Sequence, residues 1–304
     1  MNNQRQKRMK TSLIVGMGIG QLYKSVLEDM GHEVITVDSN ISKGANLPSV
    51  ESAIIAHAPF DTVHICTPNY THATIAKQLS HHAKVIFIEK PGVSTSASWS
   101  NLYFHNQNAR YLMVKNNQWR SNIKEMNELA AKSKTVEIRW HNKDRVPSPG
   151  TWFTTRELAF GGVSRDLMPH LLSLFMVLEP YYKASRQISS VAIQNWVLED
   201  VSNTDYGTVN LNGVYDVDDS CRLEYVCNNR TWILDANWRT LKEDDRSIIF
   251  TLQDDSQVKI ELGLCPEEAY KSMIEDTLLS YYEAPFWNKQ LEQDLWIHQQ
   301  IETL

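Results

Sequence analysis

The chain has 304 residues, of which 42% are hydrophobic and 22% are charged, and its formal net charge is −6 at pH 7. This length suffices for two domains with separate cores, and the composition is typical of a globular protein in water. The acidic balance argues against nucleic acid as a partner, and no apolar run approaches the roughly 18 residues that a membrane span needs.

Neither the N-terminus nor the cysteines indicate export. The segment Met1–Lys10 is polar and basic, without the apolar core of a signal peptide. The four cysteines, Cys66, Cys221, Cys227 and Cys265, have no CxxC spacing, which favours buried free thiols in a reducing compartment. We therefore expect a cytoplasmic protein.

The first predicted strand, Leu13–Val15, runs into closely spaced glycines at Gly16, Gly18 and Gly20, and an amphipathic segment from Ile19 to Met30 follows. This pattern predicts a strand, a tight turn and a helix. Glycine lets the backbone approach a ligand closely, and the N–H groups at a helix N-terminus suit a phosphate. A glycine pair after an apolar strand can also be a simple turn, so this motif alone is weak.

The second predicted strand, Glu33–Val37, ends in Asp38. A carboxylate roughly 20 residues past the glycines can accept hydrogen bonds from a ribose hydroxyl, and it would repel the 2′-phosphate of NADP, so NAD is the expected cofactor. Three following polar residues could still accommodate that phosphate and leave NADP open: Ser39, Asn40 and Lys43. Gln21 occupies the place of the usual third glycine, which normally permits close helix–strand packing, and we expect this turn to depart from the usual shape.

Strands and helices alternate up to about residue 118. The expected elements are a helix over Pro48–His57, a strand over Thr62–Cys66, a helix over Thr71–His82, a strand over Val85–Ile88, a helix over Ala97–Asn108 and a strand over Tyr111–Val114. The strands are short apolar runs, which is typical of a parallel sheet covered on both faces. We expect residues 1–118 to form a Rossmann-type, doubly wound α/β domain that binds a dinucleotide.

The remaining residues, 119–304, have a different pattern. A helix over Asn122–Lys132, a strand over Thr135–Trp140 and the segment Gly161–Leu178 come first. Polar turns then separate further predicted strands: Ile188–Leu198, Tyr206–Leu211, Cys221–Val226, Trp232–Trp238, Ser247–Leu252 and Gln257–Leu262. Two helices, over Glu267–Tyr282 and Asn288–Glu302, end the chain. We expect an α+β domain with a large, mostly antiparallel open sheet.

Three polar segments accompany the glycine turn. Thr67–His72 and Glu89–Pro91 each follow a predicted strand at its carboxyl end, where ligands bind in open α/β sheets. The third segment, Gly161–His170, lies early in the second predicted domain.

With these motifs the chain resembles the glucose–fructose oxidoreductase / inositol dehydrogenase / MocA (Gfo/Idh/MocA) family over nearly its whole length. The similarity includes the glycine turn, the Thr-Pro-Asn-x-x-His loop, Glu-Lys-Pro and the Gly-Gly-x-x-x-Asp-x-x-x-His segment. The resemblance implies that Lys90, Asp166 and His170 are catalytic and that Asn69 and His72 belong to a loop beside the cofactor. It also implies a homodimer or homotetramer formed through the C-terminal sheet.

The expected chemistry suits these residue types. Oxidation of a secondary alcohol sends a hydride to the nicotinamide and a proton to a base, and the imidazole of His170 can carry that proton near neutral pH. Lys90 would favour alkoxide charge on the same oxygen. Asp166 shares a face with His170 if both lie in one helix, where it could bind a neighbouring hydroxyl. Alternatively, Asp166 caps the helix that runs to Leu178.

The sequence thus gives two sets of candidate site residues. Cofactor contacts are expected from Gly16, Gly18, Ile19, Gly20, Asp38, Thr67, Pro68, Asn69, His72, Glu89 and Lys90. Substrate contacts are expected from Lys90, Arg120, Trp152, Asp166 and His170; Trp152 matches a tryptophan that many family members carry, and Arg120 can equally be a surface ion pair. No His, Cys and Asp cluster has the spacing of a metal site, so no metal is expected.

The predicted function is an NAD(P)-dependent oxidoreductase that transfers a hydride between the nicotinamide and a secondary alcohol or ketone of a sugar, a sugar derivative or a polyol. One alternative is a non-catalytic dinucleotide-binding sensor or regulatory protein. Another is a reductase of an imine or enone biosynthetic intermediate on the same fold. The intact set of Lys90, Asp166 and His170 counts against a pure binder, which has no need to handle protons.

Overall fold

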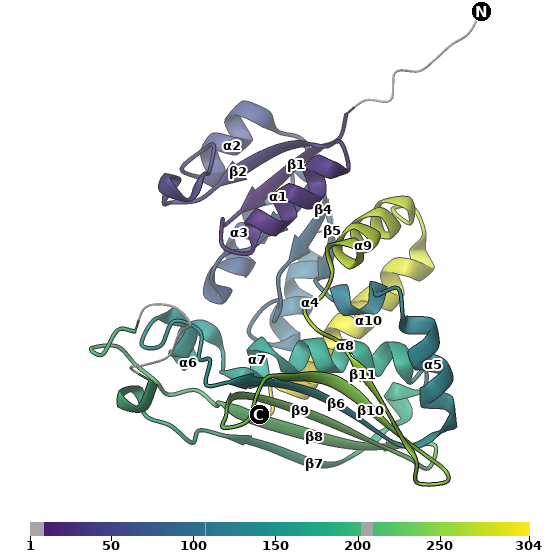
Figure 1. Ribbon diagram of the computed structural model, residues 1–304. Helices are drawn as coiled ribbons and strands as arrows, with labels where there is room; N and C mark the ends of the chain where they lie inside the picture. The colour runs from purple at the N-terminus through teal and green to yellow at the C-terminus, as the bar shows by residue number, and fades with distance from the viewer. Residues whose placement is uncertain (1–8, 107, 202–208) are drawn as a thin grey trace, which may run out of the picture.

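The computed structural model describes residues 9–106, 108–201 and 209–304. Two sheets organise the chain, one above the other in Figure 1. The expectations for most of Met1–Lys10 and for part of the predicted strand Tyr206–Leu211 concern residues outside these ranges. Residues 209–211, the described end of that predicted strand, are not in a strand.

The first sheet has five parallel strands in the order β2-β1-β3-β4-β5. Its strands are β1 (Thr11–Val15), β2 (Glu33–Val37), β3 (Phe60–Ile65), β4 (Ala83–Ile88) and β5 (Arg110–Met113), and its helices are α1 (Gly20–Asp29), α2 (Val50–His57), α3 (His72–Leu79) and α4 (Ser96–His105). Neighbouring residues of one strand pack into separate cores on its two faces, Ile14 with the side chains of α1 and Leu13 with those of α2 to α4. The predicted doubly wound sheet is confirmed.

The second sheet has six strands in the order β11-β10-β6-β9-β8-β7. Its strands are β6 (Ser133–Lys143), β7 (Arg186–Ile193), β8 (Ser220–Cys227), β9 (Arg230–Thr240), β10 (Asp245–Leu252) and β11 (Gln257–Glu261). The central pair, β6 and β9, is parallel and every other pair is antiparallel. Burial alternates along β8 and β9, so one face is packed and the other is open, as predicted.

After the first sheet, the described residues form six α-helices: α5 (Ile123–Lys132), α6 (Arg156–Ala159), α7 (Val163–Asp166), α8 (Met168–Leu178), α9 (Glu267–Leu279) and α10 (Ala284–Ile301). The largely apolar helix α8 packs on β6 and β9 and fills the space above the inner face of the second sheet. The last two helices return to the first sheet, where α9 packs on α1 and α10 packs on α4 and β5 (Figure 1). Among the described residues, no helix is both long and apolar enough to cross a membrane.

Candidate active site

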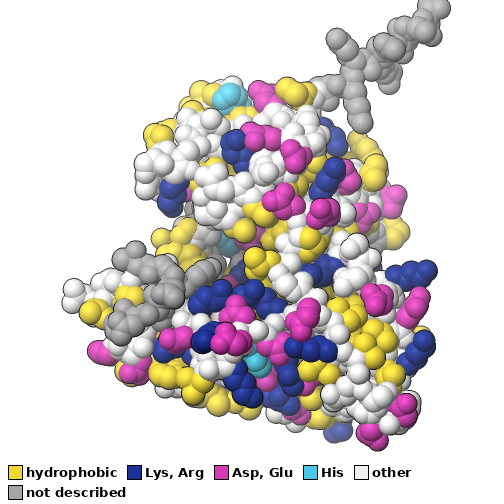
Figure 2. Space-filling view, viewed as in Figure 1, with side chains coloured by type: hydrophobic (Ala, Val, Ile, Leu, Met, Phe, Trp, Pro, Cys, Tyr) yellow, Lys and Arg dark blue, Asp and Glu magenta, His cyan; other side chains and the backbone are white. Residues whose placement is uncertain are grey.

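A cavity of about 1130 Å³ lies where the two sheets face each other, and Figure 2 shows the hollow between the upper and lower parts of the molecule. Its upper wall consists of the segments that follow β1 to β4, at the carboxyl ends of the parallel strands. Its lower wall comes from β6, β10 and the start of α8. Parallel α/β sheets bind ligands at this edge, and the cavity exceeds the usual size of a pocket for one small ligand.

The glycine turn has the close approaches that a dinucleotide cradle needs. Gly16 has a φ of +96°, and a Cβ there would lie 2.6 Å from the carbonyl oxygen of Cys66, so only glycine fits. Helix α1 begins without a side-chain cap and without an acidic residue in its first turn. Because Gly18 and Ile19 line the cavity, the positive end of this helix faces the place where a pyrophosphate would lie.

Gly20, rather than the next residue, provides the close helix–strand contact. A Cβ at Gly20 would lie 2.9 Å from Cγ2 of Ile14 in β1. Gln21 is exposed on α1, and its side-chain amide donates a hydrogen bond of 2.7 Å to the carbonyl oxygen of Lys43. The expectation that Gln21 disturbs the turn is therefore corrected, since the packing glycine lies one residue earlier and Gln21 points away to the loop after β2.

Asp38 lies at the end of β2 and lines the cavity. Its carboxylate accepts hydrogen bonds of 2.8 Å from the N–H groups of Met17 and Asn40, and Nζ of Lys43 lies 3.5 Å away. Burial raises the pKa of Asp38, but these N–H groups and the lysine outweigh it and hold the pKa below its usual value. The group is therefore an ionised acceptor at neutral pH, as a ribose-binding carboxylate must be.

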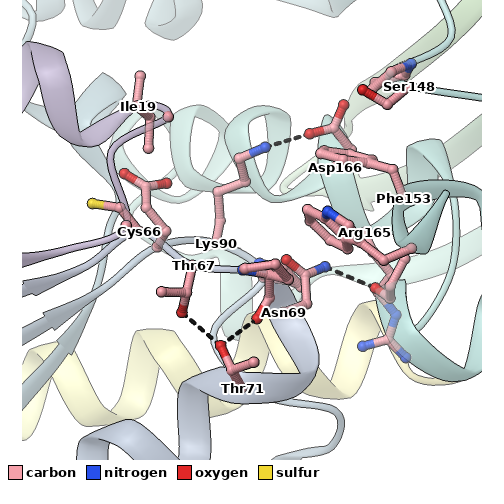
Figure 3. Close-up of a pocket in the computed structure, with 18 of the residues that line it drawn as sticks. Ile19, Cys66, Thr67, Asn69, Thr71, Lys90, Ser148, Phe153, Arg165 and Asp166 are labelled. Carbon is pink, nitrogen blue, oxygen red and sulfur yellow. Dashed lines mark hydrogen bonds and ion pairs between the residues drawn. The ribbon is translucent and has the colours of Figure 1, made fainter. Parts of the chain in front are cut away.

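Some residues of the loop after β3 line the cavity, and one expected site residue of this segment does not. Thr67, Pro68 and Asn69 line the cavity, and Nδ2 of Asn69 donates a 2.8 Å hydrogen bond to the carbonyl oxygen of Ala159, which joins this loop to the second half of the chain (Figure 3). His72 instead is completely buried and is not among the lining residues. Its ring lies between the carbonyl oxygens of Thr67 and Gly92, each 2.8 Å from a ring nitrogen.

The expected contact between His72 and the cofactor is therefore corrected. The side chain points into the protein because it starts α3 and packs below the loop, where it links the Thr67 turn to the residues that follow Lys90. Glu89, by contrast, does line the cavity and accepts a 2.6 Å hydrogen bond from the hydroxyl of Tyr23.

Lys90 and Asp166 form an ion pair on the cavity wall, and Figure 3 shows the two side chains pointing toward one another. The other carboxylate oxygen of Asp166 accepts a 3.0 Å hydrogen bond from Nε1 of Trp238. Since Trp238 comes from β9, the second sheet holds the carboxylate that positions the lysine of the first sheet.

Asp166 and His170 lie in two different helices. Asp166 ends α7, His170 is in α8, and Leu167 between them is the N-cap residue of α8 without a side-chain hydrogen bond. Both sequence-based ideas, a shared helix face and a cap by Asp166, are therefore wrong. Asp218 fixes α7 in place, because its carboxylate accepts hydrogen bonds from the N–H groups of Gly162 and Ser164.

His170 lines the cavity beside this ion pair and stacks on Trp140, with ring centroids 5.1 Å apart and planes at 17°. Its Nδ1 accepts a 3.1 Å hydrogen bond from Nδ2 of Asn117. The amide oxygen of Asn117 in turn accepts 2.7 Å from Nε of Arg120, which fixes the direction of the amide. A neutral His170 therefore carries its proton on Nε2.

Burial lowers the pKa of His170 to about 3, and the nearby charge of Lys90 adds to the effect. The ring is therefore neutral at physiological pH in the absence of any further charge in the cavity.

The two other expected substrate contacts have different outcomes. Trp152 lines the cavity and packs against Phe153, with ring centroids 4.3 Å apart. Arg120 is 7% exposed and is not among the lining residues, and its Nη1 donates a 2.7 Å hydrogen bond to the carbonyl oxygen of Leu262. The expectation that Arg120 contacts the substrate is therefore wrong. η3 (Asn116–Trp119) directs the chain into the core just before Arg120, and the side chain of Arg120 supports Asn117 there.

Sequence reasoning missed several residues of the site: Asn117, Trp140, Asn142, Arg145, Trp238 and Arg246. Most lie at inward positions of the second sheet, where only the alternation of the strands could have indicated them. Among the residues that the structure describes, no three His, Cys, Asp or Glu side chains form a group that could hold a metal ion.

Comparisons with known proteins show similarity in sequence and in fold. Residues 12–114 match the sequence profile described as "Oxidoreductase family, NAD-binding Rossmann fold" (GFO_IDH_MocA). A curated protein of Amycolatopsis mediterranei strain S699, named "Putative UDP-kanosamine synthase oxidoreductase subunit", is 28% identical over 196 residues, which are 62% of this chain and 54% of that protein. The match thus spans about half the length of this relative.

Solved structures share the fold over 97% of the chain. GenD2 from gentamicin A biosynthesis in complex with NAD has a TM-score of 0.71, with 17% identity and 92% of its chain covered. Levoglucosan dehydrogenase in complex with NADH and levoglucosan has a TM-score of 0.72, with 16% identity and 96% covered. A myo-inositol dehydrogenase from Corynebacterium glutamicum ATCC 13032 has a TM-score of 0.71, with 11% identity and 95% covered. Residues 12–114 thus match the NAD-binding Rossmann domain of the Gfo/Idh/MocA oxidoreductases, and the whole chain shares the fold of these solved dehydrogenase structures.

Proposed function

We propose that this protein is an NAD-dependent dehydrogenase or reductase that acts on a secondary alcohol or ketone of a sugar, a sugar derivative or a polyol. The observation that carries the proposal is the meeting of Lys90, Asp166 and His170 on the wall of the cavity that also contains the glycine turn and Asp38. The relatives support the substrate class, because two of the similar structures are dehydrogenases of levoglucosan and of myo-inositol.

The Gly16–Gly20 turn would hold the pyrophosphate, and Asp38 would bind a ribose hydroxyl. When bound, NAD supplies the hydride acceptor. The balanced reaction converts a CH–OH group and NAD⁺ into a C=O group, NADH and a proton. The ammonium of Lys90, held by Asp166, would stabilise negative charge on the reacting oxygen.

His170 would move the proton at its Nε2. In the arrangement with Asn117 this nitrogen carries a hydrogen and can donate a hydrogen bond to a ketone or alkoxide oxygen. Taking up a proton from an alcohol at Nε2 needs the other tautomer, with hydrogen on Nδ1, which the fixed amide of Asn117 disfavours. This arrangement of His170 therefore supports the reductive direction, in which Nε2 donates.

A screen of sugars, sugar phosphates, nucleotide sugars and polyols for a change in nicotinamide absorbance, with NAD and with NADP, tests the function. We expect turnover of at least one compound and a preference for NAD. Tight NAD binding without turnover of any compound would instead favour a non-catalytic sensor. Turnover confined to imines or enones would assign the reaction to the other alternative.

A further inference from the structure

Resting on the proposed function, we propose that the substrate is an anionic sugar whose phosphate or carboxylate group is bound by Arg145 and Arg246. These two residues line the same cavity as Lys90 and His170, on the wall that the second sheet provides. A phosphate and a carboxylate can bind in the same way, because a guanidinium donates paired N–H groups to the oxygens of either anion.

The position of Arg246 in the sheet is unusual for a charged side chain. Ile248 and Phe250 occupy the following inward positions of β10 and are completely buried, and Arg246 is the inward residue before them. It pairs across the sheet with Trp140 of β6, which also points inward. The inner face therefore changes from apolar to basic at the place where it leaves the core and becomes the cavity wall.

Arg145 and Arg246 converge on the same two acceptors. Both donate to Oδ1 of Asn142, at 3.1 Å and 3.0 Å, and both pair with Oδ2 of Asp244. Asp244 thus pairs with two guanidinium groups, and both of these groups line the cavity. An anionic ligand bound there would reduce the repulsion between the two like charges.

The charged side chains that line the cavity are mostly cationic. Its lining has five cationic side chains, Lys43, Lys90, Arg145, Arg165 and Arg246, and three acidic ones, Asp38, Glu89 and Asp166. Asp38 pairs with Lys43, and Asp166 pairs with Lys90. In Figure 2, Lys and Arg side chains gather along the lower rim of the hollow, where the field would attract an anionic ligand.

The arginines also lie near the residue that would handle the proton. The guanidinium carbon of Arg246 lies 5.6 Å from the ring of Trp140, and the same ring is stacked on His170 with centroids 5.1 Å apart. Trp140 thus contacts both residues on the cavity wall. An oxyanion bound at the arginines would therefore lie in the same part of the cavity as the reacting carbon of the sugar.

The alternative is that both arginines only secure the β9–β10 connection through Asp244, whose Oδ1 accepts a 2.8 Å hydrogen bond from the backbone N–H of Lys143. Binding measurements separate the two. Glucose 1-phosphate, glucuronate, UDP-glucose and unsubstituted glucose are titrated by calorimetry into the full chain with NADH, for the original sequence and for Arg246→Gln and Arg145→Gln. Arg139→Gln is the matched control, because Arg139 is an ion-paired arginine of the same sheet and is 31% exposed, like Arg145.

We expect at least one charged probe to bind more than 100-fold tighter than glucose, and each cavity variant to weaken that binding by tenfold or more. The affinity for NADH and the affinities of Arg139→Gln should be unchanged. Preference for glucuronate would identify a carboxylate, and preference for either phosphate compound would identify a phosphate. Charged probes that bind no better than glucose, or that bind equally to Arg246→Gln, would overturn the proposal.

Because this is a binding measurement, its outcome is independent of the catalytic proposal. Failure of the proposed function would appear separately, as absent turnover of a compound that binds beside NADH.

Discussion

Two groups of the molecule have the same chemical composition and opposite surroundings. Lys90, Asp166 and His170 lie on the cavity wall, whereas a second lysine, aspartate and histidine, Lys115, Asp294 and His298, are buried between β5 and α10. In both groups the aspartate precedes the histidine by four residues. Composition and spacing therefore do not make a catalytic site, and access to a cavity distinguishes the two.

The buried group has structural partners throughout. Lys115 forms an ion pair with Asp294 and donates a 3.2 Å hydrogen bond to the carbonyl oxygen of Met113. His298 accepts a 3.2 Å hydrogen bond from the N–H of Val93. Burial raises the pKa of Asp294 to about 6 against the opposing charge of Lys115. This group fastens the last helix to the first sheet, while the cavity group keeps its ion pair at a surface that a ligand can reach.

The largest effect is expected from Lys90→Met. Removing the ammonium that would stabilise the reacting oxygen should lower kcat/KM by about 10³-fold, with a change in melting temperature of only a few degrees. Steady-state kinetics and thermal unfolding of the same preparation measure both. A variant that keeps its activity would place the charge stabilisation elsewhere.

Lys115→Met should have the opposite effects, with a loss of stability and little loss of activity. It leaves the carboxylate of Asp294 buried without its partner, so the free energy of unfolding should fall by about 3–5 kcal/mol, whereas kcat of the folded fraction should be retained. Denaturant titration provides the measurement. Because an unpaired charge causes the loss, the double variant Lys115→Met/Asp294→Leu should recover much of it; no recovery would indicate that the ion pair is not what stabilises this region.

The part of the candidate site that could be predicted from the sequence consists of residues in short contiguous motifs. The glycine turn, Asp38 and Lys90 each follow a strand directly, so a contiguous motif indicates both the residue and its place at the sheet edge. The lower wall depends on the pairing of β10 with β6, which places Arg246 beside Trp140 although about 100 residues separate them along the chain. No local pattern indicates such a register.

Besides Arg120, three expectations were wrong for physical reasons that only packing reveals. Gly20 provides the close helix–strand contact that was expected of a third glycine, because its Cα faces Ile14. His72 turns into the core to meet two carbonyl oxygens. The break at Leu167 separates Asp166 from His170 in spite of their helical spacing. The fold was easier to predict, since apolar periodicity extends over many residues and tolerates single exceptions.

The pH dependence of stability should reflect titratable residues of both groups, together with the buried His64. Burial lowers the pKa of His64 and His170 to about 3 and that of His298 to about 4, whereas the unfolded chain takes up these protons near pH 6.5. Asp294 acts oppositely, because its pKa is about 6 in the folded state. For these four groups together, the unfolded state therefore binds about two more protons between about pH 4 and 6, and each should cost about 1.4 kcal/mol per pH unit.

The free energy of unfolding should accordingly fall as the pH decreases from about 6.5 to about 4. Urea titrations at several pH values measure this slope, and His170→Asn should reduce it by about one proton. A stability that is constant or increases over this range would contradict the buried neutral histidines.

The smallest effect concerns Asn117. In Asn117→Asp, a carboxylate would face Nδ1 of His170 and favour the tautomer with hydrogen on that nitrogen, which raises the pKa of the ring. The acidic limb of the kcat/KM profile should move up by about one pH unit. Asn117→Leu, which has no acceptor, should reduce activity without that movement; equal profiles for both variants would leave Asn117 with a packing role only.

The central claim is that His170 handles the proton of a hydride transfer in this cavity. Its most direct test is His170→Asn, with NAD affinity measured by calorimetry and turnover measured on a compound identified in the sugar screen. We predict unchanged NAD affinity and turnover reduced by at least about 100-fold. Turnover equal to that of the original protein would contradict the account.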